Sequence, residues 1–335
     1  TGLQNLGNTC FLNSCMQVIS NSGQIELKSQ FNKIDITSKQ KHKSDYLLLK
    51  EWLDLQGLMW SKNCIISPAR FVKTVQEVAK QKGKDIFTGN AQNDLPEFLL
   101  FILDTFHNAL STPVKINING RERNNTDKIA SKCYSMIKRM YEHDYSVIIE
   151  QFSGIHVSYI SEFNDKSKVL SCSPDPFLTL DLPVPNKNTV SIYDCFDEYC
   201  ITEPLTGENM WYNDVKKEKQ DAVRTLLFWK LPETLIITLK RFNSNARKIS
   251  KHINIPLDDI NLSKYIVGYN KSSYVYEVYG VCNQSGSVFG GHYTANIKKQ
   301  SGKWYNYNDV TIKEITESKV ITPEAYCLFL KKKHS

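Results

Sequence analysis

The chain has 335 residues, of which 41% are hydrophobic and 23% charged, the composition of an ordinary globular protein. Its formal net charge of +7 is spread over scattered lysines without a nucleic-acid reader motif, so we expect no nucleic-acid partner. The nine cysteines include no CxxC pair, which argues against a disulfide framework or a tetrathiolate zinc site and favours a reducing compartment, the cytoplasm or nucleus. No apolar run reaches membrane-spanning length, and we expect no membrane contact.

The first third of the chain places apolar residues at helical spacing. Ser44 and Ser67 are plausible helix caps, Pro68 suits a first helical position, and Gly83 is a stop signal. We expect helices over residues 11–19, 44–60, 68–82, 93–110 and 129–141, with an exposed loop over 111–126.

Strand-like segments follow from about residue 145. They are short, rich in β-branched and aromatic residues, and separated by turn signals. We expect strands within 145–152, 154–163, 176–185, 233–242, 273–282, 303–309 and 325–333. A helical first part followed by antiparallel strands predicts the α+β class, and we do not divide the chain into independent domains.

Cys10 stands between a loop of small and polar residues and the first expected helix. A cysteine is nucleophilic only as the thiolate, and the unpaired N–H groups at a helix N-terminus lower its pKa. Gly7 permits a tight turn there, and Asn5 and Asn8 supply side-chain amides. A cysteine hydrolase also needs an imidazole base and a third group that orients the imidazole.

His292 is the histidine whose surroundings suit that base. Two glycines precede it and allow a close approach of the backbone. A strand, a Ser-Gly turn and a returning strand are expected over 293–308. In such a hairpin His292 and Asn308 fall at the same end, with Asn308 or Asp309 near the ring.

Two segments carry a resemblance to a known family. "GLQNLGNTCFLNSCMQ" and "GGHYTANIKKQSGKWYNYND" resemble the signature boxes of the ubiquitin-specific proteases, papain-like cysteine peptidases that remove ubiquitin from proteins. Between and after the boxes, "QNDLPEFL", "PFLTLDLPVP", "LPETLIITLKRF" and "AYCLFL" continue the resemblance in family order over essentially the whole chain.

The resemblance implies one papain-like catalytic domain over 1–335 with a thumb, palm and fingers architecture. The helical thumb would cover 1–145, the fingers and adjoining palm strands 146–230, and the palm with the histidine box 231–335. Since the chain begins at Thr1 with its first motif already under way, we expect it to be part of a longer protein.

The resemblance also implies a role for each residue that matches the family's catalytic positions. Cys10 would be the nucleophile, His292 the general base and Asn308 the third member of the triad, with Asp309 the acidic residue beside it. Asn5 would help to stabilise the oxyanion, a role suited to a side-chain amide donor. The reaction would cleave the isopeptide bond after the Gly-Gly end of ubiquitin through a thioester, without a cofactor.

A narrow channel for the ubiquitin tail is implied as well. Asp94 and Glu97 match acidic residues that face the arginines of that tail, although acids are favoured at a helix N-terminus in any case. The other matched channel positions are Gln92, Phe242, Gln284, Gly290, Gly291 and Tyr293. A slot that only glycine passes gives specificity by steric rejection.

The chain departs from the family in the fingers. Typical members bind structural zinc there through two CxxC pairs, whereas the matching positions here are Asn164, Ser167, Asn213 and Lys216. We therefore expect no metal and hairpin tips held by packing alone, and we interpret three cysteines nearby as buried thiols: Cys172, Cys195 and Cys200. Gln284 stands where many relatives have histidine.

Ubiquitin and ubiquitinated proteins are the expected partners of a monomeric enzyme. Two alternatives stay open at this point: a catalytically weak or inactive pseudoprotease that binds ubiquitin, and a protease for another ubiquitin-like modifier.

Overall fold

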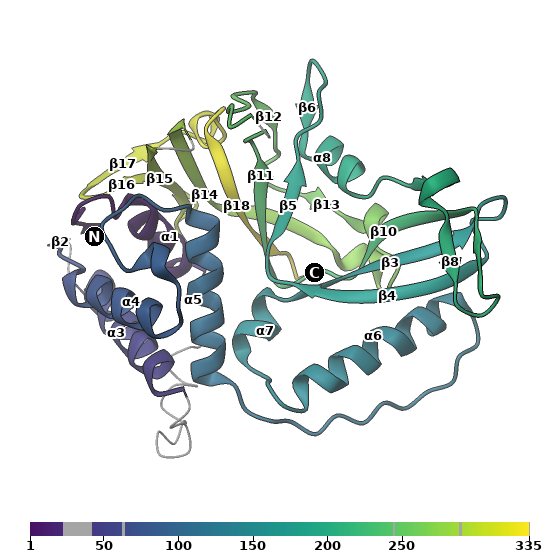
Figure 1. Cartoon of the computed structure of the whole chain (residues 1–335). Coiled ribbons are helices and arrows are strands. Elements are labelled where there is room, and N and C mark those ends of the chain that lie inside the picture. The colour runs from purple at the N-terminus through teal and green to yellow at the C-terminus, as the bar shows by residue number, and fades with distance from the viewer. Residues whose placement is uncertain (23–41, 62–63, 244, 288–289, 335) are drawn as a thin grey trace.

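Helices dominate the first part of the chain. The computed structural model describes residues 1–22, 42–61, 64–243, 245–287 and 290–334 (Figure 1). Its α-helices are α1 (Cys10–Ser20), α3 (Lys43–Ser61), α4 (Ala69–Gln81), α5 (Leu95–Leu110), α6 (Asn125–Tyr141), α7 (Val147–Phe152) and α8 (Ile192–Tyr199).

A large sheet occupies the centre of the second part. Its strands follow the order β17-β16-β15-β14-β18-β11-β5, and β13 (Ile260–Asn261) pairs with β14 beside this path. The strands of the path are β5 (Leu180–Pro183), β11 (Thr234–Lys240), β14 (Val275–Ser287), β15 (Gly290–Lys298), β16 (Trp304–Asn308), β17 (Thr311–Ile315) and β18 (Ala325–Lys332). All neighbours are antiparallel except β5 and β11, which run parallel.

A second sheet of four strands, in the order β4-β3-β10-β7, lies away from helices α1, α3, α4 and α5 and packs against α6 (Figure 1). Its strands are β3 (Gly154–Glu162), β4 (Val169–Phe177), β7 (Glu203–Leu205) and β10 (Ala222–Lys230). Three two-stranded pairs complete the fold: β1 (Gly2–Leu3) with β2 (Ile65–Ile66), β6 (Val190–Ser191) with β12 (Ile253–Asn254), and β8 (Trp211–Asn213) with β9 (Glu218–Gln220). The architecture confirms the α+β class, with a helical first part and a largely antiparallel second part.

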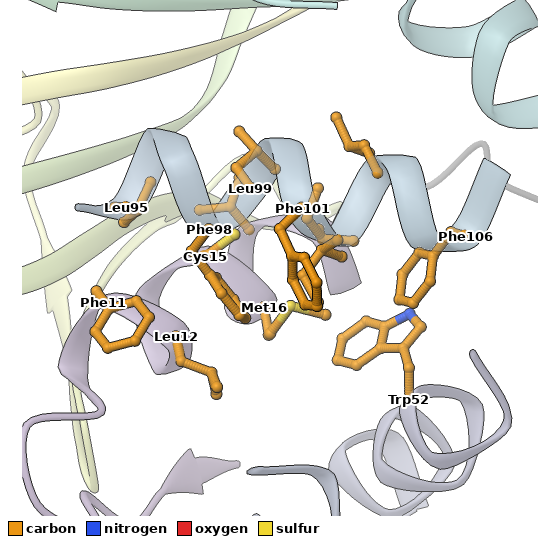
Figure 2. Packing of buried hydrophobic residues seen from close by; sticks show 14 of the residues in the cluster. Phe11, Leu12, Cys15, Met16, Trp52, Leu95, Phe98, Leu99, Phe101 and Phe106 are labelled. Carbon is orange, nitrogen blue, oxygen red and sulfur yellow. The ribbon is translucent and has the colours of Figure 1, made fainter. Parts of the chain in front are cut away.

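Helix α1 lies inside the core between α5 and the large sheet. All eleven of its residues are buried: the apolar side chains belong to the core, and buried Asn13 and Gln17 are hydrogen-bonded. Phe11 packs edge-on against Phe98 of α5 with ring centroids 5.2 Å apart. Met16 of α1 belongs to the same buried cluster (Figure 2). This packing fixes the first turn of α1, and therefore Cys10, against the sheet.

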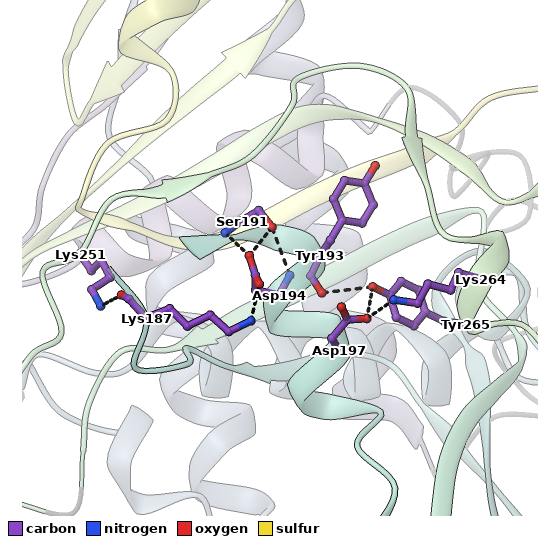
Figure 3. Close-up of polar contacts among 8 residues, drawn as sticks. All are labelled: Lys187, Ser191, Tyr193, Asp194, Asp197, Lys251, Lys264 and Tyr265. Carbon is purple, nitrogen blue, oxygen red and sulfur yellow. Dashed lines mark hydrogen bonds and ion pairs between the residues drawn. The ribbon is translucent and has the colours of Figure 1, made fainter. Parts of the chain in front are cut away.

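The buried face of helix α8 packs on the large sheet, and a polar network joins the helix to Lys187, Lys264 and Tyr265 (Figure 3). Ser191 and Asp194 form a reciprocal capping box, and Lys187 Nζ lies 2.6 Å from Asp194 Oδ1. At the other side of the helix, Asp197 accepts hydrogen bonds from Lys264 and from the Tyr265 hydroxyl, at 2.6 and 2.9 Å. The lysine and serine contacts hold the pKa of Asp194 below its usual range.

The structure corrects several expectations about local structure. Of residues 145–152, expected as a strand, 147–152 form the short helix α7 with Ser146 as its N-cap. Ser146 accepts a hydrogen bond from the Ile149 N–H at 3.4 Å, and the buried Ile148 and Phe152 are four residues apart, a helical spacing that a short apolar run does not reveal.

The caps of two helices differ from the expected ones. Ser44 is not a cap, because α3 already begins at Lys43. Ser67 is not a cap either, because α4 begins at Ala69 and its N-cap is Pro68, the residue expected at the first helical position.

Candidate active site

Cys10 opens α1 at the end of a tightly hydrogen-bonded loop. Asn5 Oδ1 accepts hydrogen bonds from the N–H groups of Gly7 and Thr9, each at 3.1 Å. Gly7 has φ +94° and Asn8 φ +57°, so the turn needs a glycine followed by a residue that tolerates the left-handed region. The expected loop-to-helix junction is therefore present, with the thiol on the first helical residue.

Burial raises the pKa of the Cys10 thiol above its ordinary value. The N–H groups of Tyr293 and Phe11 and the side chain of Gln92 act in the opposite direction, whereas the negative charge of Asp309 raises the pKa further. The expectation of a lowered pKa from the helix N-terminus alone is therefore wrong, because desolvation of the sulfur outweighs the backbone donors.

The hairpin of β15 and β16 brings His292 and Asn308 together as expected. Its register places Ala295 opposite Tyr307, so both residues fall at the same end. His292 Nε2 lies 2.7 Å from Asn308 Oδ1, a distance that fixes the ring orientation. Within the described ranges, the ring is hydrogen-bonded to Asn308 and not to Cys10. The sulfur accepts from Gln92 Nε2 at 3.8 Å, and the backbone N–H of Tyr293, the residue that follows the histidine, acts to lower the pKa of the thiol.

Gln92 links the cysteine helix to the histidine strand. Its Nε2 lies 3.8 Å from Cys10 Sγ, and its Oε1 accepts a hydrogen bond from the Gly291 N–H at 2.6 Å. The side chain therefore spans the gap between the sulfur and the backbone directly before His292.

Asp309 joins the first loop to the end of the same hairpin. Its two carboxylate oxygens accept hydrogen bonds from Asn5 Nδ2 at 3.0 Å and from Asn13 Nδ2 at 2.8 Å. Asp309 has φ +49°, the left-handed conformation that aspartate tolerates better than most residues. Residues almost three hundred positions apart in the chain are thus held in one polar cluster.

A cavity of about 310 Å³ lies beside the cysteine. Seven of the expected channel residues line it: Gln92, Asp94, Phe242, Gln284, Gly290, Gly291 and Tyr293. A Cβ at Gly291 would collide with the Ser285 carbonyl oxygen and come within 2.6 Å of Gln284 Nε2. Glycine is therefore the residue that this part of the wall accommodates.

Asp94 is fixed at the wall by two tyrosines. The Tyr293 hydroxyl donates to Asp94 Oδ1 at 3.1 Å, and the Tyr326 hydroxyl donates to Oδ2 at 3.4 Å. Burial of the carboxyl group raises its pKa, against the lowering effect of the two hydroxyls and of the Leu95 N–H. Glu97 does not line the cavity; it is exposed on the first turn of α5.

Three further wall residues carried no expected role: Asn93, Ser287 and Tyr326. Of these three, Tyr326 could have been noticed in the sequence, since it lies in the quoted segment "AYCLFL", whose residues are all buried in β18. Its contact with Asp94 depends on which residues β18 faces, and no local pattern contains that information.

Comparisons with known proteins identify the family to which the chain belongs. The profile of the family described as "Ubiquitin carboxyl-terminal hydrolase" matches residues 1–330. The chain belongs to this family. The ubiquitin carboxyl-terminal hydrolase 2 of Gallus gallus is 31% identical over 98% of the chain and 92% of its own length, and that of Bos taurus is 30% identical over 98% and 54%. The chain thus spans about half of the cattle relative.

Solved structures show the same fold at lower identity. A SAGA DUB module of Ubp8, Sgf11, Sus1 and Sgf73 bound to ubiquitin aldehyde matches all of the chain and 70% of the compared chain, with a TM-score of 0.73 at 22% identity. A module of this composition bound to monoubiquitin gives a TM-score of 0.72 at 21% identity, over 100% of this chain and 69% of that one.

The positions that the resemblance matched to zinc ligands lie in two turns that are closed by side-chain hydrogen bonds. At the β3–β4 turn, Asp165 Oδ1 accepts from the N–H and the hydroxyl of Ser167, at 3.0 and 2.6 Å. At the β8–β9 turn, Asn213 Oδ1 accepts from the N–H groups of Val215 and Lys216, at 3.0 and 3.2 Å. The described residues contain no group of three or more His, Cys, Asp or Glu side chains that could hold a metal ion.

Of the three nearby cysteines, Cys195 is fully buried, and Cys172 and Cys200 are partly exposed. In the described part of the chain, no helix combines the length and apolar character needed to cross a membrane.

Proposed function

We propose that this hydrolase domain is a deubiquitinating cysteine protease that cleaves the peptide or isopeptide bond after the C-terminal Gly-Gly of ubiquitin. The observation that carries the proposal is the 2.7 Å contact between His292 and Asn308 on the strand pair that Gln92 links to the Cys10 sulfur. The ubiquitin forms bound in the similar SAGA modules support the choice of substrate.

The glycine-walled cavity would receive the substrate tail. Gly290 and Gly291 leave room on one side, and Phe242 and Tyr293 wall the cavity with aromatic surface. Asp94 would face an arginine of the tail, which would favour its ionised form and offset the effect of burial. Glu97, exposed on the same helix turn, would meet a second arginine farther from the cavity.

The raised pKa of Cys10 determines how the first step would begin. In the free enzyme the thiol keeps its proton, so His292 would act as a general base when substrate binding brings ring and sulfur together. Catalytic hydrogen bonds that are long in a free enzyme often tighten in the complex. The proton moves to the imidazole as the sulfur attacks the carbonyl carbon, and Asn308 keeps the ring oriented throughout.

The charges of the intermediate would be matched by groups near Cys10. One N–H of the Asn5 amide donates to Asp309, which leaves its second N–H for the developing oxyanion. The imidazolium then protonates the leaving lysine amine as the carbon–nitrogen bond breaks. Water, deprotonated by His292, hydrolyses the remaining thioester and releases the ubiquitin carboxylate.

The proposal extends to the organisation and setting of the domain. We assign residues 1–145 to a thumb, 146–230 to fingers with adjoining palm strands and 231–335 to a palm. A catalytic thiol that must stay reduced suits the cytoplasm or nucleus, and a monomer is sufficient because the whole site comes from one chain.

A pseudoprotease that binds ubiquitin is the second candidate, favoured by the raised pKa of Cys10 and by the lack of a hydrogen bond between Cys10 and His292 within the described residues. The two candidates differ in whether the thiol reacts with a correctly placed electrophile.

The test uses ubiquitin that carries a C-terminal electrophile, with Cys10→Ala as the control. Covalent capture by the unmodified chain only, together with release of a fluorophore from ubiquitin amide, supports the protease. Binding without capture supports the pseudoprotease. Capture of a different ubiquitin-like modifier in place of ubiquitin would overturn the substrate assignment.

A further inference from the structure

Helix α6 lies alongside β4 of the four-stranded sheet, away from α1 (Figure 1). A groove lies between these two elements. Two adjoining cavities of about 640 and 210 Å³ form it, with α6 as one wall and residues 169–175 of β4 as the other. We call it the α6–β4 groove. The apolar side of α6 packs on the sheet through Ile129, Cys133 and Met136, so the groove lies beside that contact.

The wall formed by α6 carries an unpaired row of positive charge. Lys128, Lys132 and Arg139 are exposed, line the groove and lie on one helix face with Ser135, at spacings of four, three and four residues. In the described part of the chain, none of the three cations forms an ion pair. Two carboxylates line the larger cavity, Glu122 and Asp175, and none lines the smaller one. The groove is therefore net positive, most strongly beside residues 169–172.

The wall formed by β4 is the open edge of its sheet. Among the described strands, β4 pairs with β3 alone. Pro174 and Pro176 have no N–H to donate, so they suit positions whose backbone faces away from β3. By the alternation of an antiparallel pair, the N–H and C=O of Cys172 would face away from β3 as well, on the side where Lys128 and Lys132 line the groove. The prolines keep the rest of the edge from pairing with arbitrary strands.

We propose that the α6–β4 groove is a docking site for an extended acidic segment of a partner protein. Its backbone would pair with β4 at Cys172, and its carboxylates would contact Lys128, Lys132 and Arg139. Strand addition at an open edge is an established mode of peptide recognition, with affinity from the backbone and selectivity from side chains. The complementary charge supplies that selectivity here.

A nucleic acid fits the same groove less well. No aromatic side chain lines either cavity, so bases would find no stacking surface. Glu122 and Asp175 would also repel a continuous phosphate backbone at one end of the groove. A peptide can place neutral residues at those two positions.

The test measures fluorescence anisotropy of a labelled peptide of alternating glutamate and threonine, about twelve residues long, with the full chain. We expect the triple variant Lys128→Glu, Lys132→Glu and Arg139→Glu to weaken binding by at least about tenfold. The matched control is Lys216→Glu, Lys217→Glu and Lys219→Glu at the β8–β9 hairpin, which makes the same change in charge elsewhere and should change affinity less than about twofold.

A second arm leaves the protein unaltered, so that misfolding of a variant cannot decide the result. N-methylation of alternate peptide residues removes their N–H groups, and one of the two alternations should abolish binding. Equal weakening by both triple variants, full binding of both N-methylated peptides, or tighter binding of a single-stranded oligonucleotide of equal charge would overturn the proposal. Ubiquitin cleavage plays no part in these readouts, so they are independent of the proposed function.

Discussion

Two turns at opposite ends of the molecule are each closed by the side-chain oxygen of an asparagine (Figure 1). They differ in the partner of the Nδ2 group of that asparagine. Asn5 and Asn213 each gather two backbone N–H groups on Oδ1. The Nδ2 group of Asn213 stays within its own hairpin and donates to Gln220 at 2.9 Å. The Nδ2 group of Asn5 donates across 304 positions of sequence to Asp309.

The same local device therefore serves two purposes. At the β8–β9 turn its hydrogen bonds stay within one hairpin, so its effect should be confined to local stability. At the α1 loop it also joins the cysteine segment to the end of the histidine hairpin. Asn213 is buried and Asn5 is exposed, as suits a residue that must also reach a substrate.

The largest effect is expected from Asn5→Ala. The variant loses the turn acceptor, the link to Asp309 and the proposed oxyanion donor together, so kcat/KM should fall by roughly 10²–10³-fold. Steady-state cleavage of ubiquitin amide measures the loss, and ubiquitin affinity should be largely retained. If Asn5→Ala lowered kcat/KM no more than Asn213→Ala does, the turn at Asn5 would have no special role in catalysis.

Asp309→Asn tests how the negative charge of Asp309 affects the pKa of Cys10. The carboxylate raises the pKa of Cys10, so its neutralisation should favour the thiolate and move the pH profile of iodoacetamide alkylation to lower pH. At a fixed neutral pH, the variant should therefore be alkylated faster than the unmodified chain. Cys10→Ser provides the background from the other cysteines, and an unchanged or opposite shift would contradict the assignment.

Asn213→Ala should affect stability and leave chemistry intact. Loss of a hydrogen-bonded turn in a partly buried hairpin costs about 1 kcal/mol, or about 2 °C in melting temperature for a chain of this size. Calorimetry measures the shift, and cleavage rates should stay within about twofold of the unmodified chain. A large fall in activity would mean that the hairpin is coupled to the site.

The smallest effect is expected from metal removal. Because hydrogen bonds to Asp165 and Asn213 close the two tips, EDTA or phenanthroline should change neither activity nor melting temperature. A marked loss with either chelator would show that a metal stabilises the fold.

Much of the site could be predicted because the family boxes are local and specific. The loop at Cys10, the His292 hairpin and its register follow from short segments whose turn residues are explicit. Whether residues 147–152 are helical or extended could not be inferred in this way. The six residues are too few to distinguish the helical period of 3.6 residues from the strand period of two. The capping hydrogen bond of Ser146 and the burial of Ile148 decided it.

The pKa of Cys10 shows a different limit. A helix N-terminus predicts stabilisation of the thiolate, but the full environment includes burial under neighbouring segments and the carboxylate of Asp309. Both contributions come from residues distant in sequence. The pKa of a thiol such as Cys10 therefore depends on the tertiary structure and cannot be read from its local sequence.

By itself the sequence determined the α+β class, the candidate nucleophile with its base and orienting amide, and the lack of the usual zinc thiols, since each depends on residue type and short spacing. Tertiary structure alone decided that Glu97 lies outside the cavity, that Tyr326 holds Asp94, and that a basic helix face meets an open strand edge. These outcomes depend on which distant surfaces come together, and that is set by the packing of the whole core.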